Sequence, residues 1–91
     1  MWTSQRLEFE GSNVQLFCRT TGSPTPKITW YDRDGAKITS DQNDYKILGN
    51  GDLLIRSIGW MKNMGLYRCE AENGEGKDEV STFLYPIIEH D

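Results

Sequence analysis

The stretch that decides the fold is Gly65-Leu66-Tyr67-Arg68-Cys69. A tyrosine two residues before a cysteine, with a glycine two residues before the tyrosine, is typical of the corner where one strand of a β-sandwich begins. In that corner the phenol hydrogen-bonds back to the chain and the cysteine points into the core. Cys18 is the only other cysteine, and Trp30 follows it. These residues predict an all-β sandwich.

Alternation of apolar and polar side chains predicts the strands. We expect strands over residues 7–10, 13–18, 28–31, 36–38, 45–48, 53–58, 66–72 and 77–85, with the first at a sheet edge and Pro86 ending the last ladder. The side chains expected to face inward are those of Val14, Leu16, Cys18, Ile28, Trp30, Leu53, Ile55, Ile58, Tyr67, Cys69 and Ala71. Within 45–48 either Tyr45 and Ile47 or Lys46 and Leu48 face inward. Pro24 and Pro26 predict an extended connection, and residues 59–64 predict a corner rather than a helix.

The 91 residues make one domain, and their formal net charge of −4 argues against nucleic acid and anionic membranes as partners. No apolar run is long enough to span a bilayer. Met1-Trp2-Thr3-Ser4 is interpreted as an expression start in front of an excised module. We therefore expect residues 1–6 to be a start or edge segment, 7–86 the domain and 87–91 a tail.

Further motifs add to this pattern across nearly the whole chain. They are Gly22-Ser23-Pro24-Thr25-Pro26, Asp34-Gly35, Gly51-Asp52-Leu53, Gly65-x-Tyr67-x-Cys69 and Ala71-x-Asn73-x-x-Gly76. Together with Trp30 they resemble the intermediate-set immunoglobulin domain. The resemblance implies a two-sheet antiparallel sandwich with one inter-sheet disulfide, Cys18–Cys69, packed against Trp30. Asn63 departs from the family, which usually has aspartate there in a charge-assisted contact, although an amide can still accept a hydrogen bond.

A disulfide closing a loop of about fifty residues would stabilise the domain by roughly 4 kcal/mol in the chain-entropy model. Such a bridge requires an oxidising compartment, so we expect a secreted or extracellular protein. The alternative is an intracellular muscle-type module with two reduced core cysteines.

A narrower resemblance lies in the second half of the chain. Residues 50–55, Ile58-x-Trp60, 64–69 and Gly76-Lys77-Asp78 with Thr82-Phe83-Leu84-Tyr85-Pro86 are similar to the C-terminal module of secreted two-immunoglobulin-domain proteins of invertebrates. That group comprises neural and ectodermal development factors that bind insulin-like peptides, and related neuronal maintenance proteins. The resemblance implies sequestration of an insulin-like peptide or support of neuronal architecture.

The sequence contains no catalytic or metal-binding set. His90 is the only histidine, so neither a Ser-His-Asp nor a Cys-His arrangement is available, and two distant cysteines do not make a zinc site. Asp32 and Asp34 lie in a turn without further calcium ligands. We therefore expect a protein that is not an enzyme and that takes no cofactor or metal.

The candidate functional surface is a face of the sheet. If Thr82 and Leu84 point inward, Phe83 and Tyr85 point outward, beside Tyr31, Arg68 and Glu70. Tyr31, Phe83 and Tyr85 would then form an apolar patch rimmed by charge, which is typical of a protein-binding face. The alternative register buries both aromatic residues. The expected partner is a protein or peptide, and an insulin-like peptide, a neighbouring immunoglobulin domain or a second copy would each suit the patch. A cell-adhesion or receptor module and a structural module of a tandem array are the rival functions.

Overall fold

A computed structural model of the chain describes residues 2–18, 27–39, 44–49, 51–74 and 76–88, with the side chains of residues 2, 3 and 73 left aside. The expected connection through Pro24 and Pro26 and the tail residue His90 lie outside these ranges. The elements are β1 (Trp2–Phe9), β2 (Val14–Leu16), β3 (Lys27–Tyr31), β4 (Lys37–Ile38), β5 (Tyr45–Ile47), β6 (Leu53–Ile55), α1 (Trp60–Asn63), β7 (Gly65–Asn73) and β8 (Gly76–Ile87).

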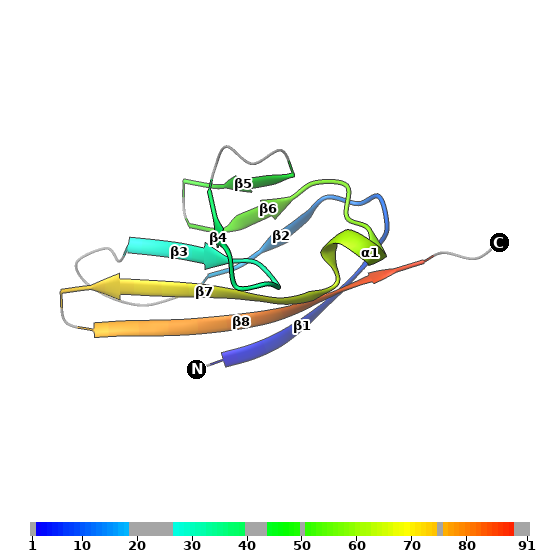
Figure 1. Cartoon of the computed structure of the whole chain (residues 1–91). Coiled ribbons are helices and arrows are strands. Elements are labelled where there is room, and N and C mark those ends of the chain that lie inside the picture. Colours follow the sequence, from blue (N-terminus) through cyan, green and yellow to red (C-terminus); the bar gives the residue numbers. More distant parts are fainter. Residues whose placement is uncertain (1, 19–26, 40–43, 50, 75, 89–91) are drawn as a thin grey trace.

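The strands form two facing sheets (Figure 1). The large sheet has the order β1-β8-β7-β3-β4, and the small sheet has the order β2-β6-β5. The pairs are antiparallel except for β1 and β8, which run parallel. The antiparallel sandwich is thus confirmed, with one parallel pair at its edge. Both of those strands run toward the end of the sandwich at which Gly11 turns the chain into β2 and the other sheet.

The core lies between the sheets and consists of the side chains that point inward, which are every second residue along each strand. In the small sheet Val14 pairs with Ile55 and Leu16 with Leu53, and all four are buried. Each fully buried aliphatic side chain of this size contributes roughly 1.5–3 kcal/mol. Tyr45 and Ile47 pack against this core, so they are the inward pair of their strand. All the side chains expected inward are buried or pack on the core.

The two sheets are joined covalently by the expected disulfide between Cys18 and Cys69, whose Cα atoms are 6.1 Å apart. Trp30 is the cross-strand neighbour of Cys69 and is fully buried. Its indole Nε1 donates a 2.7 Å hydrogen bond to the carbonyl oxygen of Gly51, which ties the large sheet to the start of β6. The buried carboxylate of Asp52 accepts hydrogen bonds from the Gln15 amide (2.9 Å) and the Cys18 backbone N–H (3.2 Å).

The corner before β7 has the predicted geometry. The Tyr67 hydroxyl donates a 2.9 Å hydrogen bond to the carbonyl oxygen of Asn63, and both residues are buried. The Asn63 side-chain oxygen accepts from the Gly59 N–H at 2.9 Å, so the amide does act as an acceptor at the position where the family usually has aspartate. Between Gly59 and Met64 the chain forms one helical turn, α1. The prediction of a corner without a helix was therefore wrong for these residues.

Several strand limits differ from those expected, and the two in β1 and β8 affect the edge of the large sheet. β1 begins at Trp2 rather than Leu7, and β8 continues through Pro86 to Ile87. Proline did not end the ladder because β7 pairs with β8 only as far as Leu84, so beyond that point β8 has a neighbour on one side alone. A residue without an N–H is tolerated where one side of a strand is unpaired.

Candidate binding face

The outer face of the large sheet carries all five residues expected on the binding face. Cross-strand partners in a ladder point to the same side of a sheet. Tyr31 is opposite Arg68, and Glu70 lies two residues further along β7. Phe83 is opposite Leu66, whereas Leu84 is fully buried and Tyr85 is 43% exposed. The structure therefore has the outward register for Phe83 and Tyr85.

Three of these residues form a polar network. The Arg68 guanidinium lies 4.3 Å from the centre of the Tyr31 ring and forms ion pairs with Glu70 (3.3 Å) and Glu79 (3.4 Å). The Glu70 carboxylate also accepts from the Tyr31 hydroxyl (3.2 Å) and lies 3.9 Å from the Lys77 ammonium. The network holds the Tyr31 ring under a cation, so Tyr31 belongs with the charged residues rather than with Phe83 and Tyr85.

Phe83 and Tyr85 form the centre of a separate apolar surface. Their ring centroids are 6.2 Å apart, and with Gln5 and Leu7 they line a groove of about 330 Å³. Tyr85 also makes an edge contact with Trp60 of α1, at 5.0 Å between centroids. We call the set of outward residues Leu7, Phe9, Leu66, Phe83 and Tyr85 the apolar half of the outer face.

Leu7, Phe9 and Leu66 were not singled out from the sequence. Leu7 is 57% exposed, although the alternation 7–10 is the pattern that usually buries its apolar members. No signal in the sequence identifies them, because their direction follows from the pairing partner: Leu7 is opposite Tyr85 and Phe9 is opposite Ile87. Only the parallel register of β1 against β8 brings these side chains to the face of Phe83.

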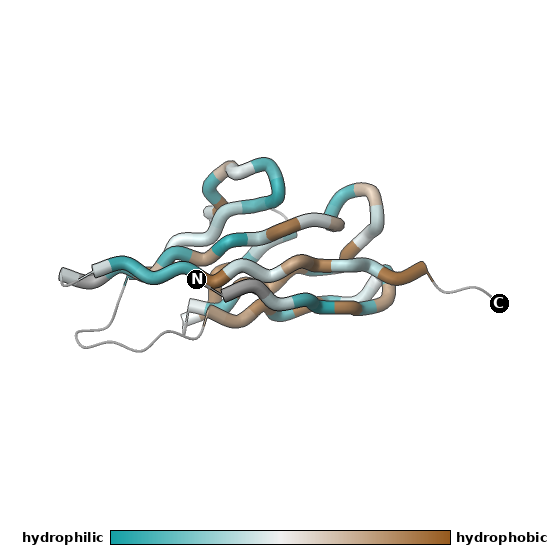
Figure 2. Tube along the Cα trace, turned by 90° about the horizontal axis from the view of Figure 1, so that it is seen from below, coloured by the Kyte–Doolittle hydropathy of each residue, from teal (hydrophilic) through white to brown (hydrophobic). Residues whose placement is uncertain are grey.

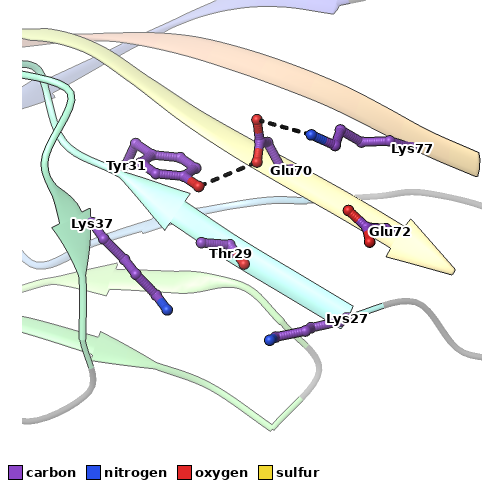
Figure 3. A pocket seen from close by; sticks show the side chains of 7 residues that line it. All are labelled: Lys27, Thr29, Tyr31, Lys37, Glu70, Glu72 and Lys77. Carbon is purple, nitrogen blue, oxygen red and sulfur yellow. Dashed lines mark hydrogen bonds and ion pairs between the residues drawn. The ribbon is translucent and has the colours of Figure 1, made fainter.

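The outer face is therefore divided along its length. The end formed by the β7–β8 hairpin is hydrophilic, and the end near the C-terminus is hydrophobic (Figure 2). At the hydrophilic end Lys27, Thr29, Tyr31, Lys37, Glu70, Glu72 and Lys77 line a second concavity of about 350 Å³ (Figure 3). We call this group, together with Arg68 and Glu79 of the polar network, the charged half.

Other chemistry is sparse in the described residues. They contain no group of three or more metal-ligating side chains, and none of their helices has the length and hydropathy required to cross a membrane. Burial raises the pKa of the Tyr67 phenol far above its usual value, so this buried hydroxyl remains a donor.

Two sheets in these orders, bridged by a disulfide beneath a buried tryptophan, with a tyrosine corner, define the class of immunoglobulin-like sandwiches. The chain belongs to the immunoglobulin domain family, which it matches over residues 2–73.

Among its relatives, the neural/ectodermal development factor IMP-L2 of Drosophila melanogaster is 43% identical over 82 residues, which are 90% of this chain and 30% of the relative. Zwei Ig domain protein zig-4 of Caenorhabditis elegans is 34% identical over 85 residues, 93% of this chain and 32% of the relative. The chain thus spans about a third of each. The crystal structure of IMP-L2 superposes with a TM-score of 0.88 at 41% identity, covering 93% of this chain and 40% of that one. The expected resemblance to these invertebrate proteins is confirmed.

Proposed function

We propose that the domain is a non-catalytic, extracellular protein-binding module whose outer face binds an insulin-like peptide. The observation that carries the proposal is the apolar half. Of the seven large apolar side chains that are exposed in the described part of the chain, four lie there: Leu7, Phe9, Leu66 and Tyr85. Soluble monomers rarely expose large contiguous apolar patches, and those that do usually use them for binding.

The residue types suit a protein ligand. Phe83 and Tyr85 are rigid, with two side-chain torsions each, so little conformational entropy is lost when they are covered. Burial of their exposed area would contribute about 25 cal/mol per Å² before the cost of association. Insulin-like peptides present apolar surfaces of their own, and the resemblance to secreted two-domain invertebrate proteins favours such a ligand. The Cys18–Cys69 bridge supports an oxidising, extracellular setting.

The test is titration of a fluorescently labelled insulin-like peptide into the wild-type domain and into the double variant Phe83→Ala/Tyr85→Ala. The control is Phe17→Ala, because Phe17 is also an exposed aromatic residue but follows the end of β2, away from the apolar half, where its ring contacts Arg6. Circular dichroism verifies that each variant is folded. We expect saturable micromolar binding to the wild type and to the control, and at least a tenfold loss in the double variant.

Absence of binding to the wild type would overturn the insulin-like peptide as ligand. Equal binding to all three proteins would leave the ligand in place and place its site elsewhere on the domain.

A second candidate is contact between copies of the chain, as in adhesion modules. It is favoured by the position of Leu7 and Phe9 on β1, the edge strand of the large sheet, since an edge strand is a ready template for pairing. Sedimentation velocity at increasing concentration tests it: a dimer that Leu7→Lys disrupts would support this function, and a monomer at all concentrations would exclude it.

A further inference from the structure

The charged half contains two lysines that form no ion pair in the polar network around Tyr31, Arg68 and Glu70. Lys77 is directed to Glu70, and Arg68 is held by Glu70 and Glu79. Lys27 and Lys37 have no ion-pair partner among the residues that the structure describes, and Glu72, the cross-strand neighbour of Lys27, forms no ion pair with it. Within the described part of the chain, the concavity therefore keeps two ammonium groups without an ion pair.

The strand register explains why the two lysines converge. Ile38 is buried opposite Trp30, so Lys37, the preceding residue in β4, points to the outer face opposite Tyr31. Lys27 occupies the same face at the start of β3. Figure 3 shows both side chains extending into the same region beside Thr29, while Lys77 turns to Glu70.

The carboxylates in the concavity do not cancel these charges. Glu70 accepts from Tyr31 and lies beside both Arg68 and Lys77, so its charge is already compensated. Glu72, opposite Lys27, is then the only other carboxylate among the residues that line the concavity, against the two lysines without an ion pair. On a chain whose formal net charge is −4, this is a local excess of positive charge in a concave site. Such a site attracts an anion.

We propose that this concavity is a subsite for a carboxylate side chain of the partner that covers the apolar half, with Lys27 and Lys37 as its ligands. This inference rests on the proposed function. Along β7 the row of Leu66 is two residues from the row of Arg68, which continues to Tyr31 and Lys37, and six residues from the row of Glu72, which continues to Lys27. At ~3.3 Å per residue the subsite therefore lies about 7–20 Å along the strands from the row of Leu66. A partner segment with apolar residues at one end and an aspartate or glutamate within that distance fits both.

The first experiment probes the subsite alone. The dipeptide acetyl-Glu-Glu-amide is titrated into ¹⁵N-labelled domain, with acetyl-Gln-Gln-amide as the neutral control and a heparin disaccharide as the sulfated alternative. We expect saturable amide shifts at Lys27, Thr29 and Lys37 with the glutamate peptide only. Shifts that are equal with the glutamine peptide would overturn the subsite. Tighter binding of the disaccharide would overturn the carboxylate assignment.

The second experiment uses the insulin-like peptide and the double variant Lys27→Gln/Lys37→Gln. Its control is Lys46→Gln/Arg56→Gln, which removes the same charge from exposed positions of the small sheet. We expect about 3- to 10-fold weaker binding for the first variant, a difference that shrinks with added salt, and little change for the control.

The two proposals fail differently. If the peptide binds both variants equally, the subsite is wrong and the proposed function stands. If the peptide binds no protein but the glutamate dipeptide still shifts Lys27 and Lys37, the proposed function is wrong and the subsite serves another acidic partner.

Discussion

Gly65 opens β7 with a backbone φ of +148°, and a Cβ at this position would lie 2.6 Å from the Cβ of Arg33. The Arg33 guanidinium donates a 3.0 Å hydrogen bond to the Met64 carbonyl. The turn that follows β3 therefore packs against the corner before β7. The motif Gly-x-Tyr-x-Cys requires glycine here because a side chain would clash with Arg33 and because φ is positive.

Gly65→Ala is expected to lower the free energy of unfolding by about 2–4 kcal/mol, because the alanine is strained at this φ and its methyl group meets a Cβ that cannot rotate away. Urea denaturation followed by tryptophan fluorescence measures the loss. Gly76→Ala is the control, since a Cβ there has no heavy atom within 4 Å. Equal stability of the two variants would contradict the close approach.

Tyr67→Phe removes the hydroxyl that donates to the Asn63 carbonyl and leaves that buried acceptor without its donor. We expect a loss of about 1–2 kcal/mol in the free energy of unfolding at pH 7. Tyr31→Phe is a useful comparison because its hydroxyl bonds to a partly exposed carboxylate, so it should lose less.

The Tyr67 pKa is raised in the folded state, chiefly by burial, above its unfolded value of about 10. The folded state therefore holds the proton more tightly. The resulting stability is fully present below pH 10 and is lost as the pH rises above 10. Denaturation curves between pH 8 and 11 should show wild type and Tyr67→Phe converging above pH 10, whereas a constant difference would show that Tyr67 does not titrate in this way.

At the scale of elements, alternation in β2, β3, β6 and β7 predicted the inward residues because one face of each strand packs on a single core. The sequence of β8 near its C-terminal end does not determine which side chains face inward, because Leu84 and its neighbours Phe83 and Tyr85 are all suited to a core. Burial of Leu84 between the sheets decides it.

The alternation of apolar and polar residues over 7–10 did not predict where β1 lies in the sheet. Leu7 and Phe9 have the spacing of core residues, yet they face outward because β1 lies parallel to β8 at the edge of the large sheet. That pairing joins the two ends of the chain and leaves no local trace in residues 7–10. The apolar half was therefore predicted only in Phe83 and Tyr85, while Leu7, Phe9 and Leu66 depend on long-range register.

The single turn α1 depends on Asn63, whose side chain accepts from the Gly59 N–H at the start of the turn. Asn63→Ala leaves that donor without its side-chain acceptor and opens a small gap at a buried position, so we expect a loss of about 1–2 kcal/mol in the free energy of unfolding. Met61→Ala, in the same turn but 83% exposed, should change stability by less than about 0.5 kcal/mol. Equal effects in chemical denaturation would show that the hydrogen bond between Asn63 and the Gly59 N–H is not needed.

At the scale of the whole molecule, the large sheet gives the domain one face with two kinds of surface. The apolar half provides area that favours burial, and the charged half provides a fixed network around Arg68 with two unused cations beside it. Area of this kind contributes affinity, whereas the placed charges contribute orientation and association rate. The small sheet shows no comparable division among its described residues.

The central claim is that a protein ligand covers the outer face of the large sheet, and mapping the bound surface tests it most directly. In a titration of ¹⁵N-labelled domain with unlabelled insulin-like peptide, we expect the amide shifts to gather on β1, β7 and β8, strongest at Leu7, Leu66, Phe83 and Tyr85. The β2, β6 and β5 amides should remain unchanged. Shifts concentrated on the small sheet, or no shifts at micromolar peptide, would contradict the account.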